Sequence, residues 1–311
     1  MLHFIINWLA STPAFAAPYA LAALGLIISE RAGVLSLGAE GFMLVGSLAG
    51  LGAELEFGGY PGMALIIAMA ATAAVSLLFA VMVVTLRVNQ VIAGLAIVFF
   101  CQGLTGLVGT MANWTNRAIS GLHEIAIWPL SEIPVLGRIL FTQDIVVFLV
   151  IPIFFIVNRV LSRSMVGLRL RAIGENPDAG DAAGISVSLY RFAAVVAGSA
   201  IVGLAGAYLS VGVVKVWIPN ETGGRGWIAV ALVIFSRWQP WRALAGALLF
   251  GCIEALIPRI AAAGIQVPQY FVAMTPYLAT IAVMAWVGVS KLTWSNEPGA
   301  LGQPYVREER R

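Results

Sequence analysis

The sequence predicts an all-α, polytopic integral membrane protein with about eight to ten transmembrane helices. Hydrophobic residues make up 60% of the 311 residues and charged residues only 11%, whereas an ordinary soluble domain carries about 25% charged residues. The apolar runs are long and continuous, about 15–25 residues each, which fits helices that cross a hydrocarbon core of roughly 30 Å. Barrel strands would instead show short stretches of alternating hydrophobicity.

The long apolar runs give the expected spans in order, namely 14–29, 40–55, 63–86, 91–111, 142–160, 192–214, 226–237, 241–260 and 270–289. The run 226–237 is too short to cross a bilayer unless its neighbours extend it. The apolar stretch 2–10 is also short, and we expect it to lie in the membrane interface or to complete an extra helix. Residues 1–311 therefore form a single transmembrane domain.

The distribution of Lys and Arg predicts the orientation of these spans. In one arrangement 13 of the 18 basic residues lie on one side of the membrane and the other 5 lie opposite. The side that is rich in Arg is expected to be cytoplasmic. This places 112–141 outside as a loop, and 161–191 and the tail 290–311 inside, with the C-terminus cytoplasmic.

The loop 161–191 contains the signals of a short helix outside the bilayer. Pro177 suits the first turn of a helix and Asn176 is a candidate N-cap, while Asp178 and Asp181 follow where the helix dipole favours carboxylates. Gly184 can end the helix, which gives about seven residues. A plain connection between two helices is usually shorter, so a helix that docks another subunit explains the length better than a structural loop does.

Three stretches of the sequence resemble a known family. Residues 167–185, GLRLRAIGENPDAGDAAGI, resemble the ATPase-coupling loop of permease subunits in bacterial ATP-binding-cassette importers for simple sugars, nucleosides and branched-chain amino acids. Residues 29–41, SERAGVLSLGAEG, resemble the first conserved pattern of this family, with Ser36 where Asn is usual. Residues 224–235, GRGWIAVALVIF, followed by Trp238 and Pro240, are similar to the nucleoside-type branch. The resemblance covers essentially residues 15–290.

The resemblance implies a permease that forms half of a translocation pathway in the bacterial cytoplasmic (inner) membrane. Its expected substrates are nucleosides or related purine or pyrimidine compounds, with simple sugars such as ribose or branched-chain amino acids as alternatives. The expected partners are a second permease, related but not identical in nucleoside-type systems, a cytoplasmic ATPase and an extracytoplasmic substrate-binding protein, often a lipoprotein. It also implies the ATPase-coupling residues Arg169, Arg171, Gly174, Glu175, Asn176, Pro177, Asp178 and Asp181.

The residues themselves indicate that this chain does not hydrolyse ATP. A phosphate-binding G-x-x-x-x-G-K-[ST] loop needs a Lys after a Gly, and Lys215 and Lys291, the two lysines of the chain, follow other residues. The energy must come from another subunit or from an ion gradient. We find no metal-ligand spacing, catalytic triad or cofactor motif, and the net charge of +3 gives no indication of nucleic-acid binding. The chain is therefore not expected to be an enzyme, and Cys101 and Cys252 are interpreted as buried thiols.

Polar residues within or beside the apolar runs are the candidates for lining a pathway, because such groups usually face a partner or a water-filled cavity. The candidates are Glu30, Ser36, Glu40, Asn89, Gln102 and Glu254. Each also has a structural interpretation: Glu30 could form a salt bridge at a helix end, and Glu40 could lie at a helix N-terminus. Glu254 as a proton-relay acid would instead suit an ion-coupled secondary carrier.

Small residues recur every four positions in two of the spans, at Ser199, Gly203 and Ala207 and at Ala247, Gly251 and Ala255. This spacing predicts close packing of helix backbones. The Gly-rich blocks 33–41 and 223–226 interrupt apolar sequence in the two halves of the chain. They predict broken helices and a possible internal repeat, as in many transporters.

Overall fold

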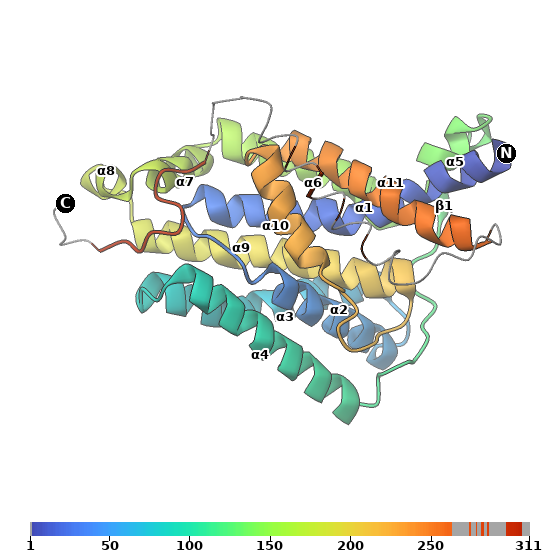
Figure 1. Ribbon diagram of the computed structural model, residues 1–311, viewed down its shortest axis with the longest axis horizontal. Helices are drawn as coiled ribbons and strands as arrows, with labels where there is room; N and C mark the ends of the chain where they lie inside the picture. Colours follow the sequence, from blue (N-terminus) through green and yellow to red (C-terminus); the bar gives the residue numbers. More distant parts are fainter. Residues whose placement is uncertain are drawn as a thin grey trace.

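The structure is a computed structural model that describes residues 2–262, 274, 278, 281–282, 285 and 297–306. Within these residues the chain is a helical bundle with one short hairpin-like pairing, β1 (Ile125–Ala126) against β2 (Thr142–Gln143). The bundle is elongated, and the start of α1 lies at the opposite end from residues 297–306 (Figure 1). The longer α-helices are α1 (Leu2–Arg31), α2 (Ala39–Glu56), α3 (Pro61–Ala80), α4 (Gln90–Met111), α6 (Ile145–Arg163), α7 (Met165–Glu175), α9 (Val187–Tyr208), α10 (Arg225–Ser236) and α11 (Pro240–Ala262).

Shorter helical elements extend or connect these helices. Two segments of π-helix extend α3 and α9, namely η1 (Val81–Thr85) and η3 (Leu209–Val214). The segment between α4 and α6 contains the 3₁₀ turn η2 (Leu130–Glu132) and the short α5 (Leu136–Leu140). The remaining short helix, α8 (Pro177–Ala182), follows α7 directly.

Six helical segments in the described residues are long and apolar enough to cross a membrane: His3–Arg31, Pro61–Thr85, Gln90–Met111, Ile145–Arg163, Val187–Val214 and Pro240–Ile260. The all-α membrane fold is thus confirmed. Helix α2 is not among the six, since its 18 residues include Glu40, Glu54 and Glu56, and α10 is shorter, as the sequence predicted. The predicted span 270–289 falls largely outside the described residues.

Residues 2–10 do not form the extra helix that was one of the two expectations, because they are the first turns of α1. Their position is held by contacts with distant parts of the chain. The Trp8 indole N–H donates to the carbonyl of Cys252 on α11 at 2.8 Å. The Gln143 amide donates to the carbonyl of Ala10 at 2.8 Å. A helix of 30 residues is about 45 Å long, so α1 reaches beyond a hydrocarbon core of roughly 30 Å.

Helices α1 and α9 form the centre of the bundle. Helix α1 packs against α9 and α11, whereas α9 also packs against α2 and α3. Helix α4 lies at one edge, where its main neighbour is α2, and it diverges from the bundle towards its C-terminal end (Figure 1). The edge position leaves large apolar side chains of α4 exposed, such as Phe99 and Leu107.

The predicted packing of small residues is confirmed. A Cβ at Gly46 of α2 would lie 2.1 Å from the carbonyl oxygen of Gly203 on α9, and one at Gly251 of α11 would lie 2.5 Å from the backbone of Ala16. Real Cβ atoms do not approach backbone so closely, so these positions admit only glycine unless the helices separate. The described cysteines are free thiols, with Cys101 buried and Cys252 half-buried.

Both predicted Gly-rich blocks, 33–41 and 223–226, begin in breaks between helices and run into the first turn of the next helix. Residues 32–38 connect α1 to α2 without regular structure, and residues 215–224 connect η3 to α10. These two connections lead to helix N-termini that meet inside the bundle: a Cβ at Gly226 would lie 2.4 Å from the backbone nitrogen of Glu40. The two broken segments are therefore joined in space, although they lie far apart in the sequence.

Candidate functional site

The segment α7–α8 (residues 165–182) projects from one end of the bundle (Figure 1). Ser164 caps α7, since its hydroxyl accepts a hydrogen bond from the N–H of Gly167 at 3.0 Å. Asn176 caps α8, since its side-chain oxygen accepts from the N–H of Ala179 at 3.0 Å, and Pro177 is the first helical residue. The chain leaves α8 through Gly184, whose φ is +78°. The short helix predicted from these residues is present, with six residues.

Helix α7 is held tightly against the ends of α1 and α9. A Cβ at Gly174 would lie 2.1 Å from the carbonyl oxygen of Arg31, so this glycine lets α7 touch the last turn of α1. The Arg169 guanidinium donates to the hydroxyl of Tyr190 on α9 at 3.2 Å. Helix α7, which leads directly into α8, is therefore joined to the bundle through a backbone contact and a polar contact.

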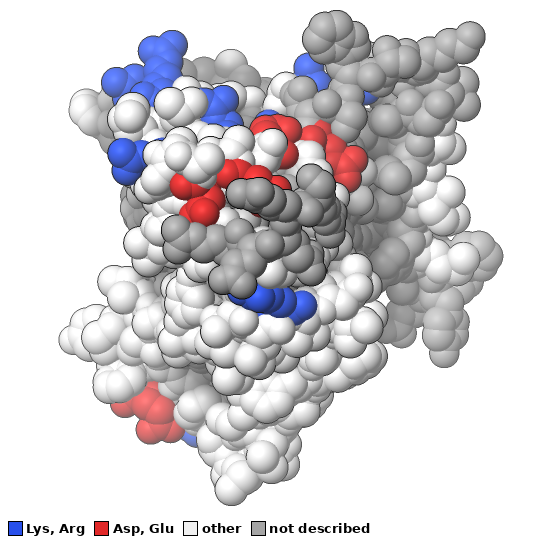
Figure 2. Space-filling model, turned by 90° about the vertical axis from the view of Figure 1, so that its left-hand side faces the viewer, with Lys and Arg blue, Asp and Glu red and all other residues white. Residues whose placement is uncertain are grey.

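Charged side chains are sorted on this end of the molecule. Figure 2 shows a group of basic side chains at the upper left of the face with acidic side chains beside it, and further charged side chains elsewhere on the face. The exposed or half-exposed residues at this end include Arg159, Arg163, Arg169 and Arg171 from α6 and α7, and Glu175, Asp178 and Asp181 from the end of α7 and from α8. A surface with such separated charges favours a protein partner of complementary pattern.

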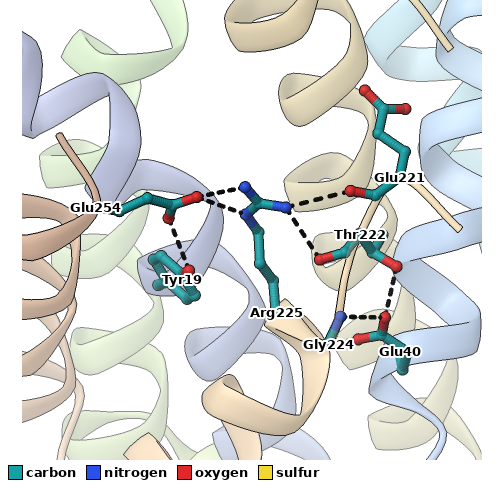
Figure 3. Close-up of polar contacts among 7 residues, drawn as sticks. All are labelled: Tyr19, Glu40, Glu221, Thr222, Gly224, Arg225 and Glu254. Carbon is teal, nitrogen blue, oxygen red and sulfur yellow. Dashed lines mark hydrogen bonds and ion pairs between the residues drawn. The ribbon is translucent and has the colours of Figure 1, made fainter. Parts of the chain in front are cut away.

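A second group of polar residues lies inside the bundle, where α2, α10 and α11 approach one another (Figure 3). Glu40, in the first turn of α2, accepts hydrogen bonds through one oxygen from the hydroxyl of Thr222 at 2.6 Å and from the N–H of Gly224 at 2.8 Å. Its other oxygen accepts from the N–H of Gly226 at 2.7 Å. One carboxylate thus serves the positive N-terminal ends of both α2 and α10.

Beside this carboxylate, Arg225 forms an ion pair with Glu254 of α11 (Figure 3). The Nε of Arg225 donates to Glu254 Oε1 at 3.1 Å, and the Tyr19 hydroxyl donates to the other oxygen of Glu254 at 2.7 Å. Arg225 also donates to the carbonyl oxygens of Glu221 and Thr222. These bonds connect α1, the 215–224 connection, α10 and α11 into one polar cluster.

The opposite end of α10 is fixed by a third set of contacts. The Trp238 indole N–H donates to Glu30 Oε2 at 2.6 Å, and the Arg31 guanidinium donates to the carbonyl of Trp238. Glu30 is almost fully buried, with 1% of its surface exposed. Helix α10 is therefore held at its N-terminus by Glu40 and at its C-terminus by the end of α1.

Comparison with known proteins adds a decisive observation. A family model described as "Branched-chain amino acid transport system / permease component" matches residues 8–294. The chain belongs to this permease family. It is also 35% identical to the "Putative glucose ABC transporter permease protein TsgC13" of Haloferax volcanii, with 99% of each chain covered. The guanosine ABC transporter permease protein NupQ of Bacillus subtilis is 32% identical over 96% of each chain. The nucleoside ABC transporter permease protein NupC of Lactococcus lactis is 32% identical, over 87% of this chain and 89% of NupC.

The protein is accordingly a transmembrane permease subunit of an ABC transporter, and a multi-pass membrane protein. Its relatives are transport subunits and not enzymes. Family membership implies an ATPase and a substrate-binding protein as partners.

The permease fold distributes the six pathway candidates over different environments. Glu30, Glu40 and Glu254 all have partners inside the fold, and Ser36 is buried in the connection before α2. Asn89 is the N-cap of α4, where its side chain accepts from Val91 N–H and Ile92 N–H. Gln102, by contrast, is exposed in the middle of α4.

Several residues of the polar cluster could not be found from the sequence. Arg225 is the first residue of α10, and its side chain is only 22% exposed. Tyr19 looked like one more residue of an apolar span, and nothing in the sequence pairs it with Glu254. The useful signal would have been the coincidence of one Arg beside a Gly-rich break and one Glu inside an apolar run, because opposite charges in a membrane pair with each other.

Proposed function

We propose that this permease imports nucleosides, or related purine or pyrimidine compounds, together with a separate cytoplasmic ATPase and an extracytoplasmic substrate-binding protein. The similarity to NupQ and NupC along most of the chain supports this substrate class. The observation that carries the mechanism is α8, a short capped helix that projects from the bundle on the rigid support of α7.

In this proposal α8 docks into the ATPase, and the α7–α8 end of the molecule is cytoplasmic, as is the C-terminus, in a bacterial cytoplasmic (inner) membrane. Arg169, Arg171, Gly174 and Glu175 support the docking helix, and Asn176, Pro177, Asp178 and Asp181 form it. When the ATPase closes on ATP, the close contact between Gly174 and Arg31 transmits the movement to α1. The broken segments before α2 and α10 then change the pathway between two permeases.

Gln102 and the outer face of α4 support the proposal that the pathway lies along this helix. A carboxamide exposed at mid-span is costly in lipid and is accommodated by a partner or by a water-filled cavity. Gly103 and Gly106 have open space around them, although glycine weakens a helix by about 1 kcal/mol relative to alanine. A second permease, related to this one or identical to it, would give these residues a close neighbour.

The test is reconstitution of the permease with its ATPase and binding protein in proteoliposomes. Uptake of radiolabelled guanosine should require ATP and the binding protein, and should be reduced strongly by excess unlabelled nucleosides. Uptake that persists without the ATPase, or that follows an ion gradient, would contradict the mechanism. Such uptake would support an ion-coupled carrier, for which Glu254 is poorly suited because Arg225 and Tyr19 occupy both of its oxygens.

A sugar substrate is the second candidate, and the similarity to TsgC13 favours it. The same liposomes distinguish the two, because a sugar permease should take up labelled glucose or ribose and should not take up labelled guanosine. Competition by leucine alone would point to a branched-chain amino acid, the substrate class named in the family description.

A further inference from the structure

Residues 297–306, which we call the strap, lie across the end of the bundle where α7 and α8 project (Figure 1). The N–H of Ala300 donates to the carbonyl oxygen of Gly174 at 2.9 Å. The N–H of Gly299 donates to the carboxylate of Glu175 at 3.2 Å. Ala300 is 4% exposed, and Leu301 and Tyr305 pack against the hydrophobic core. The strap is therefore bound to the last turn of α7, directly before the proposed docking helix.

The other side of the strap is bound to the transmembrane helices. Arg191, near the start of α9, is 3% exposed and donates to the carbonyl oxygens of Gln303 at 3.0 Å and Ala32 at 3.2 Å. Gln90, at the start of α4, donates to the carbonyl of Gln303 at 3.5 Å and accepts from the N–H of Leu35 at 2.6 Å. The strap thus joins α7 to α4, to α9 and to the broken segment that leads into α2.

Several of these contacts are made through the strap's backbone, while Leu301 and Tyr305 pack through their side chains. Two of its N–H groups and one of its carbonyl groups bond to other elements, while the Gln303 side chain is exposed. A Cβ at Gly33 would lie 3.3 Å from the carbonyl oxygen of Ala300, so the 32–38 connection approaches the strap closely. A buried guanidinium that loses a carbonyl partner is costly, which favours a strap that stays in place.

We propose that the strap is a positioning element of the coupling machinery, and that it makes α7, the 32–38 connection and the start of α4 move as one unit when the ATPase acts on α8. This inference rests on the proposed function. Without the strap, α8 would still dock, but the movement of α8 would reach only the helices that α7 touches directly. The strap extends this movement to α4, which carries the exposed Gln102, and to the entrance of α2.

The first test is Ala300→Pro, which removes the N–H that bonds to Gly174, with Gln303→Ala as a matched control that keeps its backbone carbonyl. In the reconstituted complex, transport per ATP hydrolysed should fall about fivefold or more in Ala300→Pro, the effect of one lost hydrogen bond, and should stay at the wild-type ratio in Gln303→Ala. Equal ratios in Ala300→Pro and wild type would overturn the inference. A wild-type complex without ATP-driven uptake would instead contradict the proposed function.

The second test needs no variant, and it holds if Ala300→Pro fails to fold. Hydrogen exchange of the wild-type complex should show the strap and residues 165–182 protected together, both without nucleotide and with ATP trapped by vanadate. Rapid exchange of the strap in either state, while residues 165–182 remain protected, would show that the two do not move as one unit.

Discussion

At the scale of single residues, the polar groups inside the bundle act mainly on one another. The pairing of Arg225 with Glu254 and Tyr19 neutralises a charge that would be costly inside a membrane. Glu40 neutralises the N-terminal ends of two helices. These carboxylates therefore stabilise the broken segments of the permease, and only Gln102 among the candidates faces outward from the middle of a span.

Glu254→Gln should destabilise the protein, because it leaves the Arg225 guanidinium buried without a countercharge. Breaking a buried ion pair in this way costs about 3 kcal/mol or more. The loss should appear as a lower unfolding temperature of the detergent-purified permease, and the double variant Arg225→Gln/Glu254→Gln should recover part of it. An unchanged unfolding temperature in Glu254→Gln would contradict the structural role; Glu132→Gln, at an exposed position, is the control.

Asn176→Ala should weaken coupling by removing the cap of α8. The loss of an N-cap costs about 1 kcal/mol, and a helix of six residues has few other bonds to hold it. We expect ATP hydrolysis to continue while transport per ATP falls several-fold. Asn176→Ser keeps a capping oxygen and should behave as wild type; if it is as defective as Asn176→Ala, capping is not the reason.

Residues with local roles were accessible from the sequence, and residues with distant partners were not. Asn176, Pro177 and Gly184 follow rules that depend on three or four neighbours, and the helix that they predict is present. Glu254 was found as a buried acid, but its partner depends on how α10 and α11 pack, which no local rule specifies. Glu40 was assigned correctly to a helix N-terminus, yet the contribution of Thr222 and Gly226, more than 180 residues away, could not be foreseen.

At the scale of elements, glycines determine which helices touch. A Cβ at Gly206 of α9 would lie 2.0 Å from the carbonyl oxygen of Met43 on α2, whereas one at Gly103 of α4 would have nothing within 4 Å. The four-residue spacing of small residues predicted that a face of each helix packs closely against a neighbour. The structure shows which helix that neighbour is. The sequence could not place the start of α1 correctly, because the bonds of Trp8 and Gln143 that extend it come from other elements.

Gly206→Ala should therefore lower the unfolding temperature of the purified permease, since α2 and α9 must separate to admit the new methyl group. Gly103→Ala should leave it unchanged or raise it slightly, because alanine favours a helix. If the outer face of α4 meets a second permease, Gly103→Ala should instead reduce copurification of that subunit. Equal effects of both substitutions on unfolding would contradict the packing seen between α2 and α9.

At the scale of the whole molecule, the orientation that the asymmetry of basic residues predicts is open to direct test. Glu132→Cys in the predicted outer loop should react with a membrane-impermeant maleimide in intact cells, while Ala183→Cys beside α8 should react only after the cells are opened. The wild-type chain measures the background labelling. Cys101 is buried, and Cys252 is half-buried, so any background should come from Cys252. Labelling of Ala183→Cys in intact cells would reverse the orientation.

The general architecture was predictable because long apolar runs have few alternatives in a bilayer. The number of complete crossings was harder to predict, since α2 carries three acids and α10 is only 12 residues long, so both depend on the bundle around them. The strap was predicted only as a cytoplasmic tail. Its hydrogen bonds to Gly174 and Arg191 are made by its backbone groups, which leave no trace in the choice of side chains.

The shared role of Glu40 has a consequence for biosynthesis. Its hydrogen-bond donors at Thr222, Gly224 and Gly226 are synthesised long after α2 leaves the ribosome. For most of translation the Glu40 carboxylate of α2 therefore lacks these hydrogen bonds. We expect α2 to remain beside the insertion machinery until α10 arrives. Ribosome-bound chains truncated after residue 214 should crosslink through α2 to the translocon, and ribosome-bound full-length chains should not. Glu40→Gln, which carries no charge, should release α2 from the translocon already in the truncated chains.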